Sequence, residues 1–183
     1  MPQHRGKRIG LDVGRVILNG SDADLLRDFD HGRPRDRFAA IHAVPRSFHS
    51  IRRLVEEIFG TEVWLVSRCG EQVELKVRAW LEYRRFFDET GIDPGHLKFC
   101  RQDEEKARIA AHLRLTHFVD DRMSVLGPMR GIVPHRILFR PEEQDRRQAD
   151  HGSDPSLAIA RTWREVMPLI TATNQTTRRR RSR

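Results

Sequence analysis

The stretch that most constrains the fold is Arg8–Leu18, in which two short apolar runs flank a single acid, Asp12. An apolar strand that ends in a carboxylate and then turns at Gly14 places that carboxylate at the mouth of a parallel sheet. Open α/β sheets bind ligands there, outside the carboxyl ends of their strands. Asp12 is therefore the first candidate for chemistry, and the prediction depends on whether later strands bring partners to it.

Predicted strands and predicted helices alternate along the rest of the chain. Runs rich in apolar and branched residues predict strands over 9–13, 62–67, 97–100, 116–120 and 136–139. Helical spacing of apolar residues and capping signals predict helices over 45–59, 71–90 and 103–113, and a last helix from Asp154 through Ile170. The charged segment 141–152 is expected to be a loop. Such alternation indicates a parallel sheet with right-handed crossovers and helices on both faces.

The length of 183 residues suits a single domain, predicted over 1–171. Within it, the polar segment 19–44 is expected to form a loop or small lid. The last residues, 172–183, are expected to be a basic, disordered tail.

The net charge of +8 resides in the two ends of the chain. Eight of the 34 basic residues lie before Ile9 or after Thr177, where there is no acid, so the segment between them holds 26 basic and 26 acidic residues. An arginine-rich tail such as Arg178–Arg183 can bind phosphate backbones without sequence preference, although most such tails are simply solvated. Nucleic acid is therefore retained as a candidate partner through this tail.

Other compositional features favour a cytoplasmic protein with no membrane partner. No apolar run approaches the roughly 20 residues needed to span a bilayer, and no apolar segment follows the basic N-terminus as in a signal peptide. The two cysteines, Cys69 and Cys100, form no Cys-x-x-Cys pair and no disulfide framework, which fits a reducing compartment.

Polar groups recur at the ends of later strands. Ser67 ends the second predicted strand, and Asp120 and Asp121 end the fourth. The helix before that fourth strand carries Lys106, one of only four lysines. Each of these residues has an ordinary explanation as a turn, cap or surface residue. Their joint occurrence on one edge of a sheet instead indicates a site for phosphoryl transfer.

The residue types in this set suit a metal-assisted reaction at phosphorus. Three converging carboxylates do not all stay ionised without a cation, and oxygen ligands of this type suit Mg²⁺. A metal screens the repulsion between an attacking carboxylate and an anionic phosphate. Ser67 can donate to a phosphate oxygen, Lys106 can neutralise charge, and an aspartate nucleophile splits hydrolysis into two steps.

Four motifs in order give the chain a resemblance to the haloacid dehalogenase-like (HAD) hydrolase superfamily. The first is an apolar strand followed by Asp12–Val16, and the second is Val63–Ser67, a strand that ends in serine. Lys106 matches the third, and Phe118–Asp121, a strand with paired acids, matches the fourth. No motif is specific alone. The match extends from Ile9 to about Phe139, which is most of the chain.

The resemblance implies a Rossmann-like, HAD-type domain with a five-stranded parallel sheet in the order 3-2-1-4-5. It implies that Asp12 is the nucleophile and, with the carbonyl of Gly14 and with Asp120 or Asp121, a ligand of Mg²⁺. It also implies that Ser67 and Lys106 hold the phosphoryl group. Neither region where a cap would be inserted is large, so a capless or minimally capped member is expected.

Two arginines next to motif residues are further candidates for contact with the substrate. Arg68 directly follows Ser67, and Arg122 directly follows Asp121, so each can reach the phosphate or the rest of the substrate. Arg68 is predicted to bind the phosphate together with Ser67 and Lys106.

Gly14 departs from the pattern of this family's phosphatases, which usually carry a second aspartate there as general acid. A metal ligand through the carbonyl survives the change, whereas acid catalysis by a side chain does not. Losing such a group costs about 10²–10⁴-fold in rate unless another group replaces it. Arg15, Asp22 and Asp24 lie nearby, and nothing in the sequence selects among them.

Three functions remain open on the sequence. The first is a Mg²⁺-dependent phosphatase that hydrolyses a small or accessible phosphomonoester through an aspartyl-phosphate on Asp12. The second is a catalytically weak phosphate-binding or regulatory module, which Gly14 favours. The third is a phosphatase acting on nucleic-acid ends, which combines an open site with the basic tail.

Overall fold

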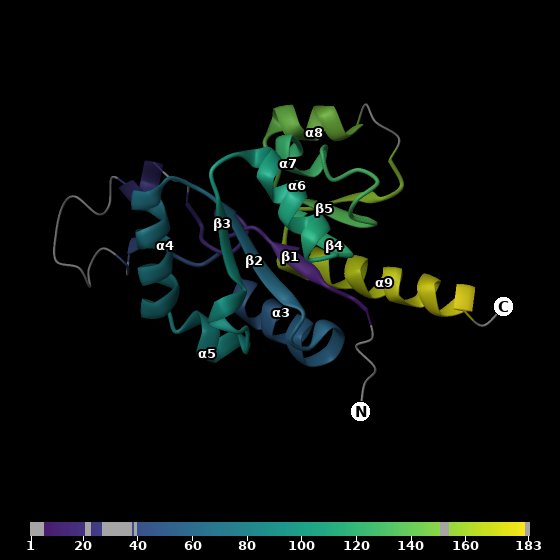
Figure 1. The fold of residues 1–183 in the computed structure, drawn as a ribbon, viewed down its shortest axis with the longest axis horizontal. Helices are drawn as coiled ribbons and strands as arrows, with labels where there is room; N and C mark the ends of the chain where they lie inside the picture. The colour runs from purple at the N-terminus through teal and green to yellow at the C-terminus, as the bar shows by residue number, and fades with distance from the viewer. Residues whose placement is uncertain (1–5, 21–22, 27–37, 39, 151–153, 182–183) are drawn as a thin grey trace.

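The computed structural model describes residues 6–20, 23–26, 38, 40–150 and 154–181, with side chains through residue 172. These residues form one α/β domain around a parallel sheet of six strands in the order β3-β2-β1-β4-β5-β6 (Figure 1). The expectation of a single Rossmann-like domain with a parallel sheet is confirmed. The predicted number of strands, five, is wrong, because a sixth strand pairs in parallel with β5.

Each strand except β6 falls close to its predicted range. The strands are β1 (Ile9–Leu11), β2 (Val63–Arg68), β3 (Leu97–Cys100), β4 (His117–Asp120), β5 (His135–Phe139) and β6 (Leu157–Ala160). All three residues of β1 are buried, as expected of a central strand covered on both faces. Gly10 is required there, because a Cβ atom would lie only 2.5 Å from the Phe118 ring.

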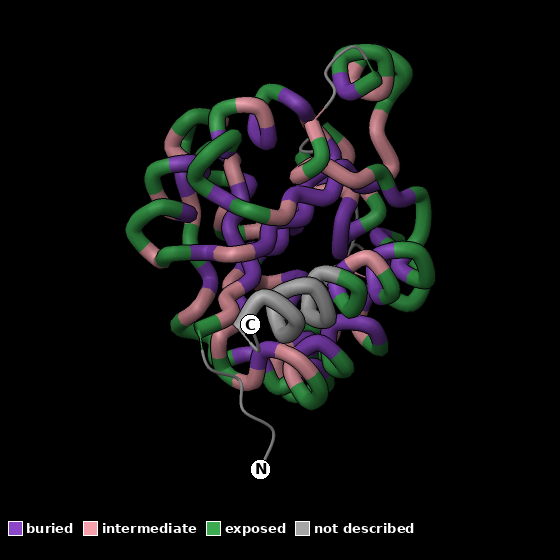
Figure 2. Tube along the Cα trace, turned by 90° about the vertical axis from the view of Figure 1, so that its right-hand side faces the viewer, coloured by how far each residue is buried: buried purple, intermediate pink, exposed green. Residues whose placement is uncertain are grey.

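Helices cover both faces of the sheet. The helices are α3 (Ser47–Leu54), α4 (Glu71–Tyr83), α5 (Phe86–Thr90), α6 (Asp103–His112), α7 (Met123–Leu126), α8 (Glu143–Asp150) and α9 (Trp163–Arg181). Helix α3 continues as a π-helical turn over Val55–Phe59, and a short 3₁₀ turn over Pro94–His96 precedes β3. One apolar cluster joins the sheet to α3, α4 and α9, and a second joins it to α6 and α7. Buried residues therefore run through the middle of the fold, with exposed residues on its outer turns (Figure 2).

The last helix begins later than predicted. Helical spacing from Ile159 to Ile170 predicts one helix from Asp154, but Leu157–Ala160 is strand β6 and α9 starts at Trp163. The boundary is fixed by Glu165, whose carboxylate accepts hydrogen bonds from the Arg161 amide (2.7 Å) and the Thr162 hydroxyl (3.2 Å). A Thr-x-x-Glu pattern is a capping signature, so the sequence contained the signal for this helix start.

Two other segments also differ from expectation. The segment 141–152, expected to be a loop, contains α8, which buries only Ala149 and has Arg146 and Arg147 paired with Glu143. A helix held by exposed side-chain pairs leaves no apolar stripe in the sequence. At the C-terminus, α9 continues through Arg181, so most of the segment predicted to be a disordered tail is helical in the structure.

Part of the segment 19–44, predicted to be a loop or lid, packs against the domain. Leu25 is buried, and the Trp80 indole donates a 2.9 Å hydrogen bond to the carbonyl of Ile41. Residues 21–22, 27–37 and 39, including Asp22, lie outside the described residues. Within the described part of the chain, no helix is both long enough and apolar enough to cross a membrane.

The buried His117 at the start of β4, next to the half-buried His135 at the start of β5, predicts how stability depends on pH. Burial, followed by the charges of His135 and Lys7, lowers the pKa of His117 to about 3. The unfolded chain, with an ordinary histidine pKa near 6.5, therefore binds more protons than the folded protein between pH 3 and 6.5. Stability falls as the pH drops through this window, by up to about 1.4 kcal/mol per pH unit.

His117→Leu is expected to flatten this dependence, measured as the slope of the unfolding free energy against pH between 5 and 6.5. The exposed His112→Leu is the matched control and should keep the wild-type slope. An unchanged slope in His117→Leu would show that the proton is taken up elsewhere.

Candidate active site

The register of the sheet brings the predicted site residues to one edge. Leu11 on β1 lies opposite Leu65 on β2 and Val119 on β4. The next residues after Leu11 and Val119 are Asp12 and Asp120, so the two acids meet at the carboxyl ends of adjacent strands. The amide of Asp12 donates a 2.9 Å hydrogen bond to the Val119 carbonyl, which fixes β1 against β4 at this point.

Lys106 joins the two acids from α6. Its Nζ lies 2.5 Å from Asp12 Oδ1 and 2.7 Å from Asp120 Oδ2, and its side chain is fully buried. Burial pulls the pKa of Lys106 down, but the charges of Asp12 and Asp120 outweigh this effect and hold the pKa above its ordinary value. Lys106 therefore stays charged at the centre of the site.

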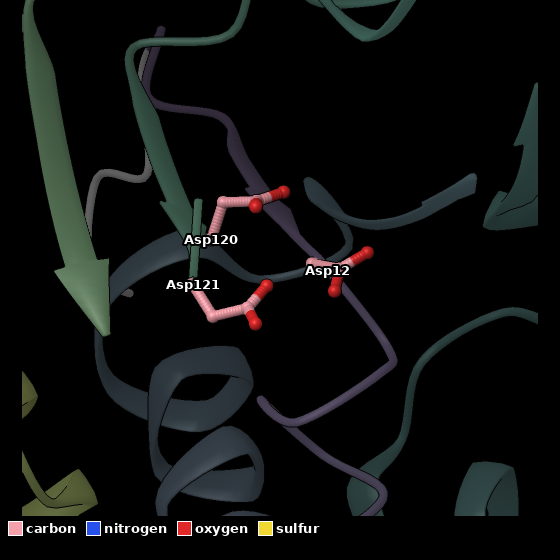
Figure 3. A group of neighbouring side chains, drawn as sticks. All are labelled: Asp12, Asp120 and Asp121. Atoms are coloured by element: carbon pink, nitrogen blue, oxygen red, sulfur yellow. The ribbon is translucent and has the colours of Figure 1, made fainter. Parts of the chain in front are cut away.

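Asp121 completes a group of three carboxylates (Figure 3). One oxygen of each of Asp12, Asp120 and Asp121 lies within 4.8 Å of the others, an arrangement that can hold a metal ion. Burial, offset by Lys106 and reinforced by Asp12, raises the pKa of Asp120 to about 6. Burial and the charges of the other two acids raise the pKa of Asp121 to about 7. Lys106 thus leaves part of the negative charge uncompensated.

These acids open into a cavity of about 280 Å³ at the edge of the sheet. Asp12, Gly14, Ser67, Arg68 and Asp121 line it, so the structure brings together the predicted phosphate-binding serine and arginine with two of the acids. Lys106 and Asp120 lie behind this surface and are fully buried.

Two arginines at the mouth of the cavity share one partner. Arg68 Nε lies 3.1 Å from Asp103 Oδ1, and Arg122 lies 3.1 Å from the same oxygen. Ser124 donates a 2.7 Å hydrogen bond to the other oxygen of Asp103. Asp103 is the first residue of α6, whose cap is Gln102 in a reciprocal arrangement with Glu105. Asp103 instead holds Arg68 and Arg122 beside the cavity.

Two acids of the cavity, Glu142 and Asp145, were not identified from the sequence, and Arg15 was named only as one of three residues near Gly14. Arg15, in a left-handed backbone conformation, contacts Asp121 at 3.0 Å and also pairs with Glu142. Glu142 and Asp145 line the cavity from the segment that follows β5. Their position in the sequence could have identified these residues, because residues just after the parallel strands lie at the same edge of the sheet.

Gly14 leaves open space next to the acids. A Cβ atom added there would lie 3.8 Å from Asp12 Oδ2 and 3.9 Å from the carbonyl oxygen of Gly20, which are ordinary contact distances. Its backbone conformation is one that any residue can adopt, since its φ lies outside the left-handed range. The missing side chain at this position therefore reflects neither crowding nor backbone strain.

Both cysteines are buried and neither forms a disulfide. Burial raises the pKa of the Cys100 thiol to about 11, so this thiol stays protonated at neutral pH. Cys69 follows Arg68 at the end of β2 and packs in the core.

Comparison with solved structures places this geometry on a known fold. The D,D-heptose 1,7-bisphosphate phosphatase of B. bronchiseptica, in complex with magnesium and phosphate, is 16% identical, with a TM-score of 0.64, over 91% of this chain and 99% of that one. A phosphoserine phosphatase is 14% identical, with a TM-score of 0.58, over 88% and 98%. A haloacid dehalogenase-like hydrolase from Xanthomonas campestris is 11% identical, with a TM-score of 0.58, over 92% and 98%.

No protein-family model matches the sequence, and neither does any curated protein. The structural likeness shows that the chain has the fold of HAD-like hydrolases. The resemblance seen in the four sequence motifs and the likeness of the whole domain thus point to the same class of fold.

Substitution of Asp121 tests the electrostatics of the three acids. Because its pKa is raised in the folded state, ionisation of Asp121 costs stability as the pH rises from about 4 to about 7. Asp121→Asn is therefore expected to stabilise the metal-free protein at pH 8, on the order of 1–2 kcal/mol, despite losing the half-exposed Arg15 pair. Chemical denaturation in EDTA measures this change.

Adding MgCl₂ should then stabilise the wild type, by about 2.7 kcal/mol at 100 times its dissociation constant, and stabilise the variant much less. Asp88→Asn, which removes an exposed charge on α5, is the control and should respond to Mg²⁺ as the wild type does. Destabilisation of Asp121→Asn in EDTA would contradict the electrostatic account.

Proposed function

We propose that the protein is a Mg²⁺-dependent phosphatase that hydrolyses a phosphomonoester through an aspartyl-phosphate on Asp12. The observation that carries this proposal is the buried Lys106 bridging Asp12 and Asp120 next to Asp121, at the open edge of a HAD-like fold. This arrangement positions one carboxylate toward a cavity while keeping its charge partly balanced. The three neighbours compared above are hydrolases by their names, and two are phosphatases.

The residues present fit a Mg²⁺ ion. Three carboxylates with oxygens within 4.8 Å form a hard oxygen donor set, and burial raises the pKa of Asp120 and Asp121, so a bound cation would stabilise their ionised forms. Asp12, Asp120 or Asp121, and the carbonyl of Gly14 would hold the ion. When bound, Mg²⁺ would neutralise charge on the transferring phosphoryl group.

Asp12 is the proposed nucleophile because it combines exposure to the cavity with a fixed orientation. One of its carboxylate oxygens accepts from Lys106, which orients the group and lowers its repulsion toward an incoming phosphate. A carboxylate oxygen attacks phosphorus, the bond to the leaving oxygen breaks, and that oxygen takes a proton. Water then cleaves the aspartyl-phosphate, which releases phosphate and restores Asp12.

Ser67 and Arg68 are the proposed contacts for the remaining phosphate oxygens. Both line the cavity at the end of β2, on the side of β1 away from Asp120. A hydroxyl and a guanidinium supply donors that match the tetrahedral oxygens of a phosphoryl group. Asp103 keeps Arg68 near the cavity mouth.

The first test is hydrolysis of a panel of phosphomonoesters, including an aryl phosphate, with and without Mg²⁺. Asp12→Asn keeps the size of the side chain and its acceptor toward Lys106 but removes the nucleophile, so turnover should fall to background. The catalytically weak binding module makes the opposite prediction: phosphate or Mg²⁺ binds, measured by calorimetry, with no turnover above the Asp12→Asn background on any substrate.

Gly14→Asp is expected to supply a proton donor at the position where this family's phosphatases usually carry one. The open space at Gly14 accepts the side chain, and a positioned general acid is worth about 10²–10⁴-fold, so kcat for a poor leaving group should rise at least about tenfold. An activated aryl phosphate, whose leaving group needs little protonation, should gain much less.

Gly14→Asn is the matched control for this experiment. It adds nearly the same volume and no acid, so it should give no gain in kcat. Equal rates for the two variants would show that another group already donates the proton.

A further inference from the structure

Four arginines surround a second cavity on the active edge of the sheet. This cavity, of about 510 Å³, is lined by Arg46, Arg140, Arg161 and Arg164, and we refer to it as the arginine pocket. Arg46 precedes α3, Arg140 follows β5, Arg161 follows β6, and Arg164 lies in the first turn of α9. Its lining is otherwise largely apolar, from Val44, Pro45 and Trp163.

The four arginines differ from most other described arginines in having no acidic partner among the described residues. Within the described residues, Lys106 and twelve arginines form ion pairs with acidic side chains. The four arginines of the arginine pocket are not among these twelve. No acidic residue lines the arginine pocket. Three of the four side chains are exposed, and Arg140 is half-buried. Like charges gathered around one hollow repel each other, and a bound anion would remove that cost.

The arginine pocket is connected to the active-site cavity by adjacent residues. Arg140 donates a 2.9 Å hydrogen bond to the side-chain oxygen of Asn19, and the next residue, Gly20, lines the active-site cavity. Glu142, two residues after Arg140, lines that cavity as well. The two cavities therefore lie next to each other at this edge of the sheet.

The strand order sets the length that a ligand needs to reach both cavities. From β1 to the middle of β5 and β6 is two and a half strand spacings, or about 12 Å at about 4.8 Å per spacing. A stacked nucleic-acid strand advances about 3.4 Å per nucleotide, so the arginine pocket lies three to four nucleotides from the site of reaction. A small phosphoester at Asp12 does not reach it.

We infer that the arginine pocket binds the phosphate backbone of a single nucleic-acid strand whose terminal phosphate occupies the site at Asp12. The inference rests on the proposed function and narrows its substrate class. Guanidinium groups match phosphate oxygens in paired hydrogen bonds, and the apolar lining suits the body of a nucleotide. An acidic peptide offers carboxylates to the same arginines but carries no ester phosphate for Asp12.

The test measures binding of a fluorescent, terminally phosphorylated ten-nucleotide strand to the Asp12→Asn protein by anisotropy. In this background, Arg161→Gln/Arg164→Gln removes two phosphate contacts. For single strands each contact contributes about 0.7 to the salt exponent, so affinity at 0.1 M salt should fall about 25-fold and the slope should lessen by about 1.4. Arg52→Gln/Arg108→Gln removes two exposed arginines elsewhere and is the control for net charge.

Several outcomes would overturn the inference. An equal loss in the control pair would show attraction by net charge alone. The inference would also be wrong if a single nucleotide bound with the same affinity as a strand of six. It would be wrong as well if an acidic ten-residue peptide competed as well as the strand.

Turnover separates this inference from the proposed function. With Asp12 intact, the ratio of kcat/KM for the strand to that for an aryl phosphate should fall in Arg161→Gln/Arg164→Gln. If no substrate turns over while the strand still binds through these arginines, the proposed function fails and the arginine pocket stands.

Discussion

The rest of the site depends on the Lys106 ammonium buried between Asp12 and Asp120. A lysine with no exposed surface is tolerated only because two carboxylates accept from it, and removing one partner of such a buried group typically costs about 3–5 kcal/mol. The contact ties α6 to β1 and β4, so folding itself positions the proposed nucleophile. Asp121 is paired instead with Arg15 at 3.0 Å and Arg122 at 3.8 Å, so the third acid is held from the loop after β1 and from the start of α7.

The sequence predicted the central strands and the residues at their ends, because buried parallel strands are continuous apolar runs and their carboxyl ends share one edge. Asp12, Ser67 and Asp121 were found in this way, and all three line the same cavity. Strand β6 was missed because Ile159 also fits the helical spacing of the apolar residues in α9, and this spacing outweighed the Thr162–Glu165 capping pattern. Helix α8, whose support is ion pairs between exposed residues, has no apolar pattern by which to be found.

Charge was the property that the sequence described least well. Summed over residues 9–177 the chain is neutral, and this sum places the basic excess at the two ends. Folding redistributes the balance, because Arg68 and Arg122 share Asp103, while Arg46, Arg140, Arg161 and Arg164 come together from three separate segments in a pocket whose described lining holds no acid. A sum along the chain cannot show such a cluster, since its members are up to 118 positions apart in the sequence.

Gly14 affects both the chemistry at Asp12 and the charge of the cavity that receives the substrate. It lies beside Gly20, and both glycines line the cavity on the path from Asp12 to Asn19 and Arg140. An aspartate at position 14 would supply a proton donor, but it would also add a negative charge beside Asp12, since a Cβ atom at this position lies 3.8 Å from Asp12 Oδ2. For a ligand with one phosphate at Asp12 and others in the arginine pocket, that charge would repel the intervening backbone. Neither Gly14 nor the described lining of the arginine pocket contributes an acid, whereas Glu142, which lines the active-site cavity, is paired with Arg15. Binding of a polyanion along this edge therefore depends on Arg15 balancing the charge of Glu142.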